Sequence, residues 1–446
     1  MGRLFGTDGV RGIANQELTC ELALGLGRAG ATVLARRARG RVRMAVGRDT
    51  RRSGDLLEAA LIAGAMSVGA DVWRLGVATT PAVAYLVRDL GLEGGVVISA
   101  SHNPAPYNGI KFFDGDGYKL ADALEDEVAA LVAGPWADLP AGADLGWGEE
   151  RSAELERYVE FVAGLAGPLT GLRIVCDCAH GAAWRLAPAA FGRAGAAVAA
   201  VAAAPDGLNI NHGCGSLHPE MLGRAVVAQG AAVGFAFDGD ADRLIAVDER
   251  GQVVDGDHLL AILGCDMLAR GLLPGATVVA TVMSNLGLEV CLQAAGGCLR
   301  RTRVGDRYVL EEMRLHGYAL GGEQSGHIIF LNHHTTGDGL TTAALLADLL
   351  RRSGRPLSEL AKSMQVFPQV LRNLRVARRE SLEGNMRVEA AIRAAQARLG
   401  VRGRVLVRPS GTEPLVRVMV EGEDPELVER AADDIAGVVA AEFGVV

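Results

Sequence analysis

The chain has 446 residues and a hydrophobic content of 49%, which is enough for about three domains with conventional cores. Its formal net charge is −8, and only 4% of its residues are aromatic. These values argue against a nucleic-acid-binding surface, which needs a basic stripe and stacking rings. A small anionic ligand held by local arginines and backbone N–H groups remains compatible with this acidity.

The sequence carries no recognisable membrane or export signal. No run of about 18 apolar residues occurs, and the first residues lead into a polar, glycine-rich motif instead of a signal segment. We therefore expect a cytoplasmic protein with no membrane partner. The seven cysteines are scattered and include no C-x-x-C pair, which argues against both a disulfide framework and a zinc site.

One pattern occurs three times: a short apolar strand, a polar or glycine-rich loop, a helix, a glycine and a second apolar strand. The three copies have their first strands at residues 43–46, 173–176 and 277–280 and their second strands at residues 72–75, 197–201 and 298–302. Strands and helices that alternate at this spacing form βαβ units, so we predict mainly parallel or mixed α/β sheets. Such folds bind ligands in the loops at the carboxyl ends of their strands.

Breaks in composition divide the chain into four segments. They fall at the Gly/Ala/Pro-rich residues 134–148, at the turn cluster 248–251 and near Phe367. We predict α/β domains at 1–150, 151–250 and 251–367 and an α+β domain at 368–446. In the last domain we predict strands at 371–377, 404–407 and 416–421 and helices at 386–399 and 425–443. The fold class is therefore α/β, with three structurally similar mixed-sheet domains plus a smaller C-terminal α+β domain.

Ser101 is the strongest candidate for a nucleophile or a phosphate carrier. It follows the apolar strand 95–98 and precedes His102-Asn103-Pro104, so its hydroxyl lies in a loop at the carboxyl end of a strand. An isolated Ser-His pair is more often an ordinary loop serine beside a helix cap. A serine hydrolase is disfavoured because adjacent residues do not easily form a nucleophile–base hydrogen bond and no third partner is evident.

Three aspartates, Asp238, Asp240 and Asp242, lie between the apolar segments 233–237 and 244–247. Burying three carboxylates without a cation would be very costly. Oxygen ligands with no nearby His or Cys favour Mg²⁺. An EF-hand is disfavoured because Arg243 stands where its loop needs glycine and because the flanks are strands. Taken alone, the motif is also compatible with a solvated acidic turn.

Two further loops have the composition of ligand-binding loops. Residues 408–414 (RPSGTEP), with Arg417 just beyond, offer guanidinium, hydroxyl and backbone N–H groups that suit a phosphate monoester. Residues 321–327 (GGEQSGH) combine acceptors and a hydroxyl, as recognition of sugar hydroxyls or an amino group requires. Each loop could by itself be an ordinary turn.

A dinucleotide-type G-x-G-x-x-G pattern at residues 25–30 has a different explanation. It lies inside a helical stretch that begins near Glu21 and has no strand directly before it, so we predict close helix packing there. The chain contains no P-loop and no G-x-S-x-G elbow, which weakens kinase and hydrolase interpretations.

Taken together, the motifs resemble those of the α-D-phosphohexomutases over essentially the whole chain. In the order typical of that family, the motifs are residues 6–12 (GTDGVRG), 47–51 (GRDTR), 99–104 (SASHNP) with 108–112 (NGIKF), 238–243 (DGDADR), 322–327 (GEQSGH) and 408–414 (RPSGTEP). Gln324 and the segments 281–287 and 336–339 resemble the bacterial branch that acts on glucosamine phosphates. Asp206 and Leu217 depart from the usual pattern outside the phosphoryl-transfer loops.

This resemblance implies four domains around a central cleft and a phosphoserine at Ser101. Phospho-Ser101 would donate to glucosamine 6-phosphate, and the 1,6-bisphosphate intermediate would reorient and return its other phosphate, giving glucosamine 1-phosphate, a precursor of UDP-N-acetylglucosamine. Mg²⁺ would be held by the phosphoserine and Asp238, Asp240 and Asp242, and a catalytic amount of a hexose 1,6-bisphosphate would act as activator.

The resemblance also implies roles for other residues. Arg11, His102 and Lys111 would surround the phosphoserine, with Lys111 a candidate proton shuttle and Arg11 a charge clamp. The sugar would contact Glu323, Ser325 and His327, and the non-reacting phosphate would contact Arg408, Ser410, Gly411, Thr412 and Arg417. The implied partner is a small sugar phosphate, the implied assembly is a homodimer, and the last domain would move to open and close the cleft.

Two alternatives share the same residues. A phosphomannomutase or phosphoglucomutase would use the same chemistry on another sugar. A non-catalytic, metal-dependent sugar-phosphate sensor would use the same cleft without turnover.

Overall fold

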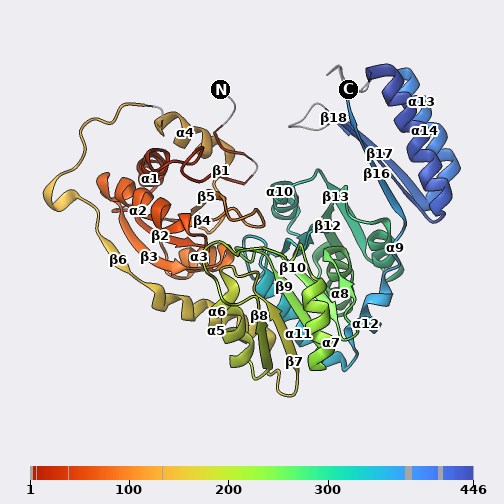
Figure 1. Cartoon of the computed structure of the whole chain (residues 1–446), viewed down its shortest axis with the longest axis horizontal. Coiled ribbons are helices and arrows are strands. Elements are labelled where there is room, and N and C mark those ends of the chain that lie inside the picture. Colours follow the sequence, from red (N-terminus) through yellow and green to blue (C-terminus); the bar gives the residue numbers. More distant parts are fainter. Residues whose placement is uncertain are drawn as a thin grey trace. The chain divides into compact units, whose positions relative to one another are not determined.

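The structure is a computed structural model that describes residues 4–6, 8–38, 40–132, 134–376, 384–409 and 415–444. Its contacts group into two compact units (Figure 1). The larger unit comprises Met1–Val282 and Leu299–Ser363, and the C-terminal unit comprises Met283–Cys298 and Met364–Val446. The larger unit holds three mixed sheets, each covered by helices, and the C-terminal unit holds a smaller antiparallel sheet.

The first sheet of the larger unit has six strands in the order β1-β5-β4-β2-β3-β6. Strands β2, β3, β4 and β6 run parallel, β5 pairs with β4 in the antiparallel sense, and β1 pairs antiparallel with β5 at the edge. The strands are β1 Val10–Ile13, β2 Arg43–Arg48, β3 Asp71–Val77, β4 Gly94–Ile98, β5 Tyr107–Asp114 and β6 Gly148–Glu150. The helices are α1 Cys20–Ala35, α2 Ser53–Ser67, α3 Thr80–Asp89 and α4 Asp122–Val132.

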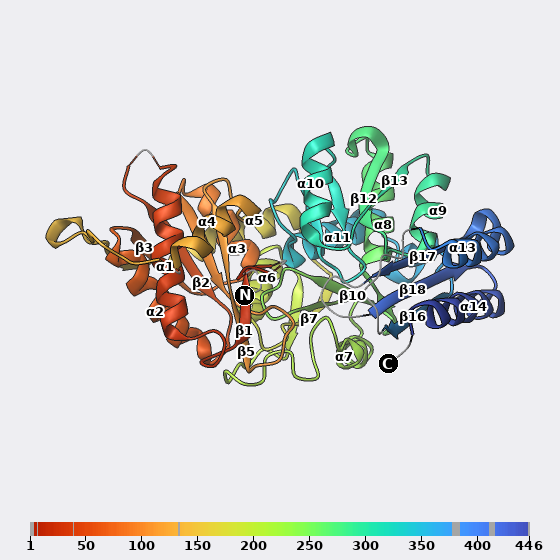
Figure 2. The ribbon, with the colours of Figure 1, turned by 90° about the horizontal axis from the view of Figure 1, so that it is seen from above.

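Helices α1 and α2 lie side by side (Figure 2) and touch at glycines. A Cβ atom on Gly27 would overlap the Leu61 carbonyl, and one on Gly64 would overlap the Leu24 carbonyl. The predicted interpretation of the 25–30 pattern as close helix packing is therefore confirmed. Glycine brings the two backbones together and lets the apolar faces of both helices join one core.

The second sheet has five strands in the order β11-β10-β9-β7-β8. Its strands are β7 Arg173–Asp177, β8 Ala197–Val201, β9 Val233–Phe237, β10 Leu244–Asp248 and β11 Val253–Val254, and its helices are α5 Leu155–Ala166, α6 Ala183–Arg193 and α7 Glu220–Gln229. Strands β9 and β10 form an antiparallel hairpin in which Phe237 faces Leu244. The hairpin turn therefore carries all three aspartates of the DGDADR motif.

The third sheet has four strands in the order β13-β12-β14-β15. Its strands are β12 Thr277–Thr281, β13 Cys298–Thr302, β14 Leu320–Gly322 and β15 Ile328–Phe330, and the nearby helices are α8 Gly256–Ala269, α10 Asp306–His316, α11 Gly339–Ser353 and α12 Leu357–Leu360. Strands β14 and β15 are antiparallel, and the GEQSGH segment connects them. The short 3₁₀ helices in the described residues are η1 Gly142–Asp144, η2 Ser152–Glu154, η3 Pro274–Ala276, η4 Ala361–Ser363 and η5 Gly400–Arg402.

The C-terminal unit is an antiparallel sheet of β16 Gln369–Arg375, β18 Leu415–Gly422 and β17 Gly403–Pro409, in that order. Helices α13 Met386–Leu399 and α14 Pro425–Phe443 cover one face of it (Figure 1). The side chains of Asn385 and Asp424 accept backbone N–H bonds at the starts of these helices. Both helices have the predicted bounds, while Ala377 of the predicted strand lies outside the described residues.

Helix α9 Leu286–Ala294 also belongs to the C-terminal unit. The Leu286 N–H donates to Glu421 Oε1 at 3.0 Å, and Asn285 Nδ2 donates to the Phe367 carbonyl at 3.0 Å. The predicted α/β class, with three similar domains and a smaller C-terminal one, is confirmed. The bounds of the four domains, 1–150, 151–250, 251–367 and 368–446, stay a prediction. None of the helices in the described residues is long and apolar enough to span a membrane.

The α1–α2 contact gives a stability prediction. Gly27→Ala should destabilise the protein by about 1–3 kcal/mol, because the new methyl group meets backbone that cannot easily move. Gly164→Ala is the matched control: its Cβ would meet open space in α5, so it should stabilise by up to about 1 kcal/mol through helix propensity. Thermal unfolding of the two variants checks this, and equal melting temperatures would contradict it.

Candidate active site

Ser101 lies in the connection between β4 and β5, at the carboxyl end of β4. It is buried, with 1% of its surface exposed, and has the left-handed φ of 50°. Its N–H donates to Ser99 Oγ at 2.9 Å. Its own Oγ donates to Asp238 Oδ2 at 2.5 Å and lies 3.2 Å from His102 Nδ1. The serine hydroxyl therefore points at the aspartate loop of the second sheet.

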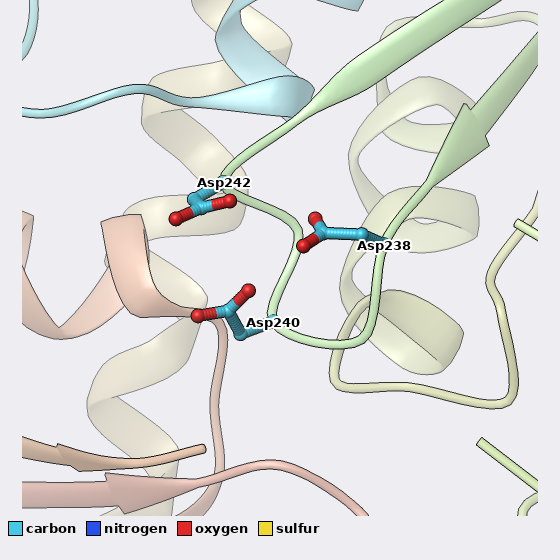
Figure 3. Close-up of side chains that lie close together, drawn as sticks. All are labelled: Asp238, Asp240 and Asp242. Atoms are coloured by element: carbon cyan, nitrogen blue, oxygen red, sulfur yellow. The ribbon is translucent and has the colours of Figure 1, made fainter. Parts of the chain in front are cut away.

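The three aspartates converge from the β9–β10 turn (Figure 3). All three are buried, and their ligand oxygens lie within 4.8 Å of one another. The turn is tight: Ala241 has a φ of 57°, and the Arg243 N–H donates to Asp238 Oδ1 at 3.2 Å. A solvated acidic turn is therefore excluded by burial.

Gly239 lets the serine and aspartate loops meet. A Cβ atom at this position would lie 2.5 Å from the Ser101 carbonyl oxygen, a distance that no side chain tolerates without backbone movement. The glycine of the motif thus has a steric reason: the two loops touch through backbone, which brings the Asp238 carboxylate within reach of the serine hydroxyl.

The aspartate cluster has the properties of a cation site. Burial, and then the carboxylates of Asp242 and Asp240, raise the pKa of Asp238 well above its usual value. Among the residues that the structure describes, the buried Oδ1 atoms of Asp240 and Asp242 have no hydrogen-bond partner. Hard oxygen donors that are buried, crowded and partly unsatisfied fit Mg²⁺.

Lysines balance part of this negative charge. Lys111 Nζ lies 2.9 Å from Asp240 Oδ2 and 2.9 Å from Asp8 Oδ2. Burial lowers the pKa of Lys111, but Asp240, Asp8 and Asp242 outweigh it, so the pKa is raised and the lysine is charged. Lys119 continues the chain of ion pairs, 2.5 Å from Asp8 Oδ1 and 2.5 Å from Asp306 Oδ2.

A cavity of about 570 Å³ opens beside these groups. The predicted site residues that line it are Arg11, His102, Asp242, Glu323 and His327. Burial lowers the pKa of His102 to about 4, and the positive charges of Arg243 and Arg11 add to the effect. The pKa of Arg11 is raised because Asp8 and Asp240 outweigh the opposing effect of burial. The cavity therefore combines a neutral imidazole with fixed cations, which suits a phosphorylated ligand.

The GEQSGH loop contributes unevenly to this cavity. The Leu244 N–H donates to the Gly326 carbonyl at 3.0 Å, which ties the loop to the aspartate hairpin. His327 is buried, and its Nδ1 lies 3.6 Å from Asp242 Oδ2. Burial lowers the pKa of His327, but the Asp242 carboxylate has the larger opposite effect, so the pKa is raised. Ser325 is half-buried and is not among the described residues that line the cavity.

Gln324, the residue that resembles the amino-sugar branch, lies outside this cavity. Its side chain is exposed and its Nε2 donates to Asp255 Oδ2 at 3.4 Å. Asp255 in turn caps α8 by accepting the His258 N–H. Gln324 therefore holds the loop against α8.

The C-terminal unit carries two of the predicted phosphate-binding residues. Arg408 and Arg417 are directly opposite each other on β17 and β18. Burial and the neighbouring Arg417 charge lower the pKa of Arg408, and Arg417 Nε is buried with no hydrogen-bond partner in the described part of the chain. Like charges facing each other are destabilising unless an anion joins them. Ser410, Gly411 and Thr412 lie outside the described residues.

Sequence reasoning missed four charged residues that line or support the cavity. They are Asp8, Lys119, Arg243 and Asp306. Asp8 and Arg243 lie within motifs that were already singled out, so motif membership was the available signal. No sequence signal pointed to Lys119 and Asp306, because the two residues that pair here lie 187 residues apart in the chain.

The match to known families covers most of the chain. The four domain models of phosphoglucomutase/phosphomannomutase match in order: alpha/beta/alpha domain I at residues 2–135, domain II at 156–251, domain III at 255–367 and the C-terminal domain at 371–438. The chain belongs to the phosphoglucomutase/phosphomannomutase family. The predicted resemblance to the α-D-phosphohexomutases and the predicted enzyme class, an intramolecular phosphotransferase, are confirmed.

Individual relatives match this chain over nearly its whole length. The phosphoglucosamine mutase of Moorella thermoacetica is 58% identical over 96% of this chain and 97% of its own. The phosphoglucosamine mutase of Symbiobacterium thermophilum is 56% identical over 99% of this chain and 100% of its own. A solved structure, a phosphoglucomutase/phosphomannomutase family protein from Burkholderia thailandensis, has a TM-score of 0.83 and 27% identity over 99% of this chain and 98% of that one.

The aspartate cluster gives a metal-binding prediction. Mg²⁺ should raise the melting temperature of the protein, because an ion that binds only the folded state stabilises it. Asp238→Asn should raise the melting temperature without metal, since it removes a buried and repelled charge, and should abolish the rise caused by Mg²⁺. Calorimetric titration and thermal unfolding check both. An unchanged Mg²⁺ response in the variant would contradict the assignment.

Proposed function

We propose that this enzyme is a phosphoglucosamine mutase that interconverts glucosamine 6-phosphate and glucosamine 1-phosphate through a phosphoserine at Ser101. The observation that carries the proposal is the 2.5 Å contact between Ser101 Oγ and Asp238 at the edge of a buried carboxylate cluster. Two near full-length relatives with this name support the choice of sugar.

The proposed reaction moves two phosphoryl groups. In the first step, O1 of glucosamine 6-phosphate forms a bond to the phosphorus on Ser101 as the Oγ–P bond breaks, which gives the 1,6-bisphosphate and free serine. The intermediate reorients, and Ser101 Oγ then takes the phosphoryl group from O6. The product is glucosamine 1-phosphate, and the phosphoserine is regenerated. A catalytic amount of a hexose 1,6-bisphosphate would restore enzyme that has lost its phosphate.

Asp238, Asp240 and Asp242, together with the phosphate on Ser101, would hold Mg²⁺. When bound, the ion would supply positive charge that stabilises the phosphoryl group during transfer. Arg11 and Lys111 add fixed positive charge beside the same groups, which matters because phosphoryl transfer depends mainly on positioning and electrostatics.

Two side chains are candidates for moving the substrate proton. His102 Nδ1 lies 3.2 Å from Ser101 Oγ and faces the cavity. Lys111 Nζ lies beside Asp240 and Asp8. The proton of O1 must leave in the first step and a proton must reach O6 in the second, so one group can serve both steps in opposite directions.

The sugar and its second phosphate would be bound by separate groups. Glu323 and His327 face the cavity and would contact the sugar, with Ser325 on the same loop. Arg408 and Arg417, with Ser410, Gly411 and Thr412, would bind the non-reacting phosphate. A homodimer and a cytoplasmic location complete the proposal on the basis of the family resemblance.

A phosphomannomutase or phosphoglucomutase is the second candidate, and the placement of Gln324 favours keeping it. Because Gln324 is exposed and bound to Asp255, it makes no contact with the cavity that would select an amino group. Amino-sugar preference then depends on other residues of the cavity.

The substrate preference is directly measurable. With Mg²⁺ and a catalytic amount of a hexose 1,6-bisphosphate, kcat/KM should be at least about tenfold higher for glucosamine 6-phosphate than for glucose 6-phosphate or mannose 6-phosphate. A preference for glucose 6-phosphate or mannose 6-phosphate would contradict the proposed substrate but not the phosphoserine mechanism.

The role of Ser101 is tested by a pair of variants. Ser101→Ala should lower kcat by at least about a thousandfold, because it removes the group that carries the phosphate. Ser99→Ala removes the hydrogen bonds that Ser99 Oγ makes with the Ser101 N–H and with Asp49 but leaves the phosphate carrier in place, so it should retain measurable turnover. Full turnover by Ser101→Ala would exclude the mutase mechanism. Sugar-phosphate binding without turnover by protein phosphorylated on Ser101 would favour the sensor.

A further inference from the structure

Arg51 is a fully buried cation that, among the described residues, pairs with Asp49 and not with Asp238, Asp240 or Asp242. Its side chain is 0% exposed and pairs with Asp49, which is also 0% exposed, at 2.8 Å. The rest of its guanidinium donates to backbone carbonyls of the Ser101 loop. Nη1 donates to the Pro104 carbonyl at 2.6 Å, and Nη2 donates to the Ser101 carbonyl at 2.9 Å and the Asn103 carbonyl at 2.7 Å. A buried arginine is thus used to hold one loop in shape.

A second side chain reaches the same loop from the second sheet's domain. Asn211 Nδ2 donates to the Ser101 carbonyl at 2.9 Å and to the Asn103 carbonyl at 3.2 Å. The Asn211 N–H donates to the Ala179 carbonyl at 2.9 Å, which anchors it in its own domain. The Ser101 carbonyl therefore accepts two hydrogen bonds, one from each side, while Gly239 packs against it.

The amide on the other side of Ser101 belongs to the same network. The Ser101 N–H donates to Ser99 Oγ, and Ser99 Oγ donates to Asp49 Oδ2 at 2.6 Å. Asp49 is the carboxylate that pairs with Arg51. Both peptide groups that flank Ser101 are therefore fixed by the Asp49–Arg51 pair and Asn211.

Ser101 needs such support because its φ of 50° lies in the left-handed region, which is unfavourable for a non-glycine residue. In this conformation its Oγ meets Asp238. We infer that Arg51 and Asn211 are positioning residues that clamp the Ser101 carbonyl from two domains, hold the serine in its left-handed conformation and so aim the transferred phosphate at the carboxylate cluster. This inference rests on the proposed function for its effect on turnover.

Three variants test the clamp. Asn211→Gly removes the donor and tolerates the φ of 59° at this position. Arg51→Lys keeps the charge but loses the planar fork that reaches three carbonyls. Arg52→Met is the matched control, because the neighbouring Arg52 is exposed and, among the described residues, its hydrogen bond is that of its backbone N–H to the Gly207 carbonyl.

We expect Asn211→Gly and Arg51→Lys to lower kcat by roughly tenfold to a hundredfold, the scale expected when a reacting group is misplaced by about 1 Å. KM for the sugar phosphate should change by less than about threefold, because the residues that face the cavity are untouched. In the double variant, the fold-decrease in kcat should be smaller than the product of the two single-variant decreases, since both donors act on one carbonyl. Arg52→Met should keep wild-type kcat.

Hydrogen exchange of the peptide that spans residues 99–106 gives a readout independent of turnover. Exchange should be faster in Asn211→Gly than in wild type and unchanged in Arg52→Met. Wild-type exchange and wild-type kcat in a folded Asn211→Gly protein would overturn the clamp, as would a loss confined to KM. Full turnover by Ser101→Ala would instead remove the proposed function, and the exchange result would still decide whether the loop is held.

Discussion

The structure depends on one electrostatic constraint: three carboxylates are buried within 4.8 Å of one another in a hairpin turn, and a serine hydroxyl points at one of them. Such a cluster is unstable without positive charge. Lys111 supplies part of it in the protein itself. The Oδ1 atoms of Asp240 and Asp242, which have no hydrogen-bond partner among the described residues, are suitable ligands for a divalent cation. In the proposed function, charge balance at this cluster would therefore serve folding, metal binding and phosphoryl transfer together.

The backbone arrangement serves this constraint. Ser101 follows the carboxyl end of β4, and the aspartates follow β9, so each loop is presented by a rigid buried strand. Gly239 allows the two loops to touch through backbone. The clamp formed by Arg51 and Asn211 then fixes the serine against the carboxylates. Ion pairs of Lys119 with Asp8 and Asp306 tie the N-terminal loop to the start of α10 beside the same cavity.

Local signals made much of this predictable from the sequence. The helices at 386–399 and 425–443 have the predicted ends because Asn385 and Asp424 cap their first turns and glycines follow their last. Apolar strands on both sides of the DGDADR turn predicted that Asp238, Asp240 and Asp242 are buried together in one tight loop.

What could not be predicted comes from contacts between distant segments. Arg51 binds carbonyls 50 to 53 residues away in the chain, and neither its motif nor its type says which backbone it will meet. Gln324 fits the family motif, but a motif does not show which side chains of a turn face inward. Only the packing of the loop against α8 reveals that Gln324 points to Asp255.

The most direct test of this account follows the phosphate itself. Protein that carries radiolabelled phosphate on Ser101 is mixed with glucosamine 6-phosphate and Mg²⁺ and quenched within one turnover. We predict that the label leaves the protein and appears in the sugar 1,6-bisphosphate and then in glucosamine 1-phosphate. Accumulation of glucosamine 1-phosphate while the label stays on Ser101 would contradict the phosphoserine mechanism.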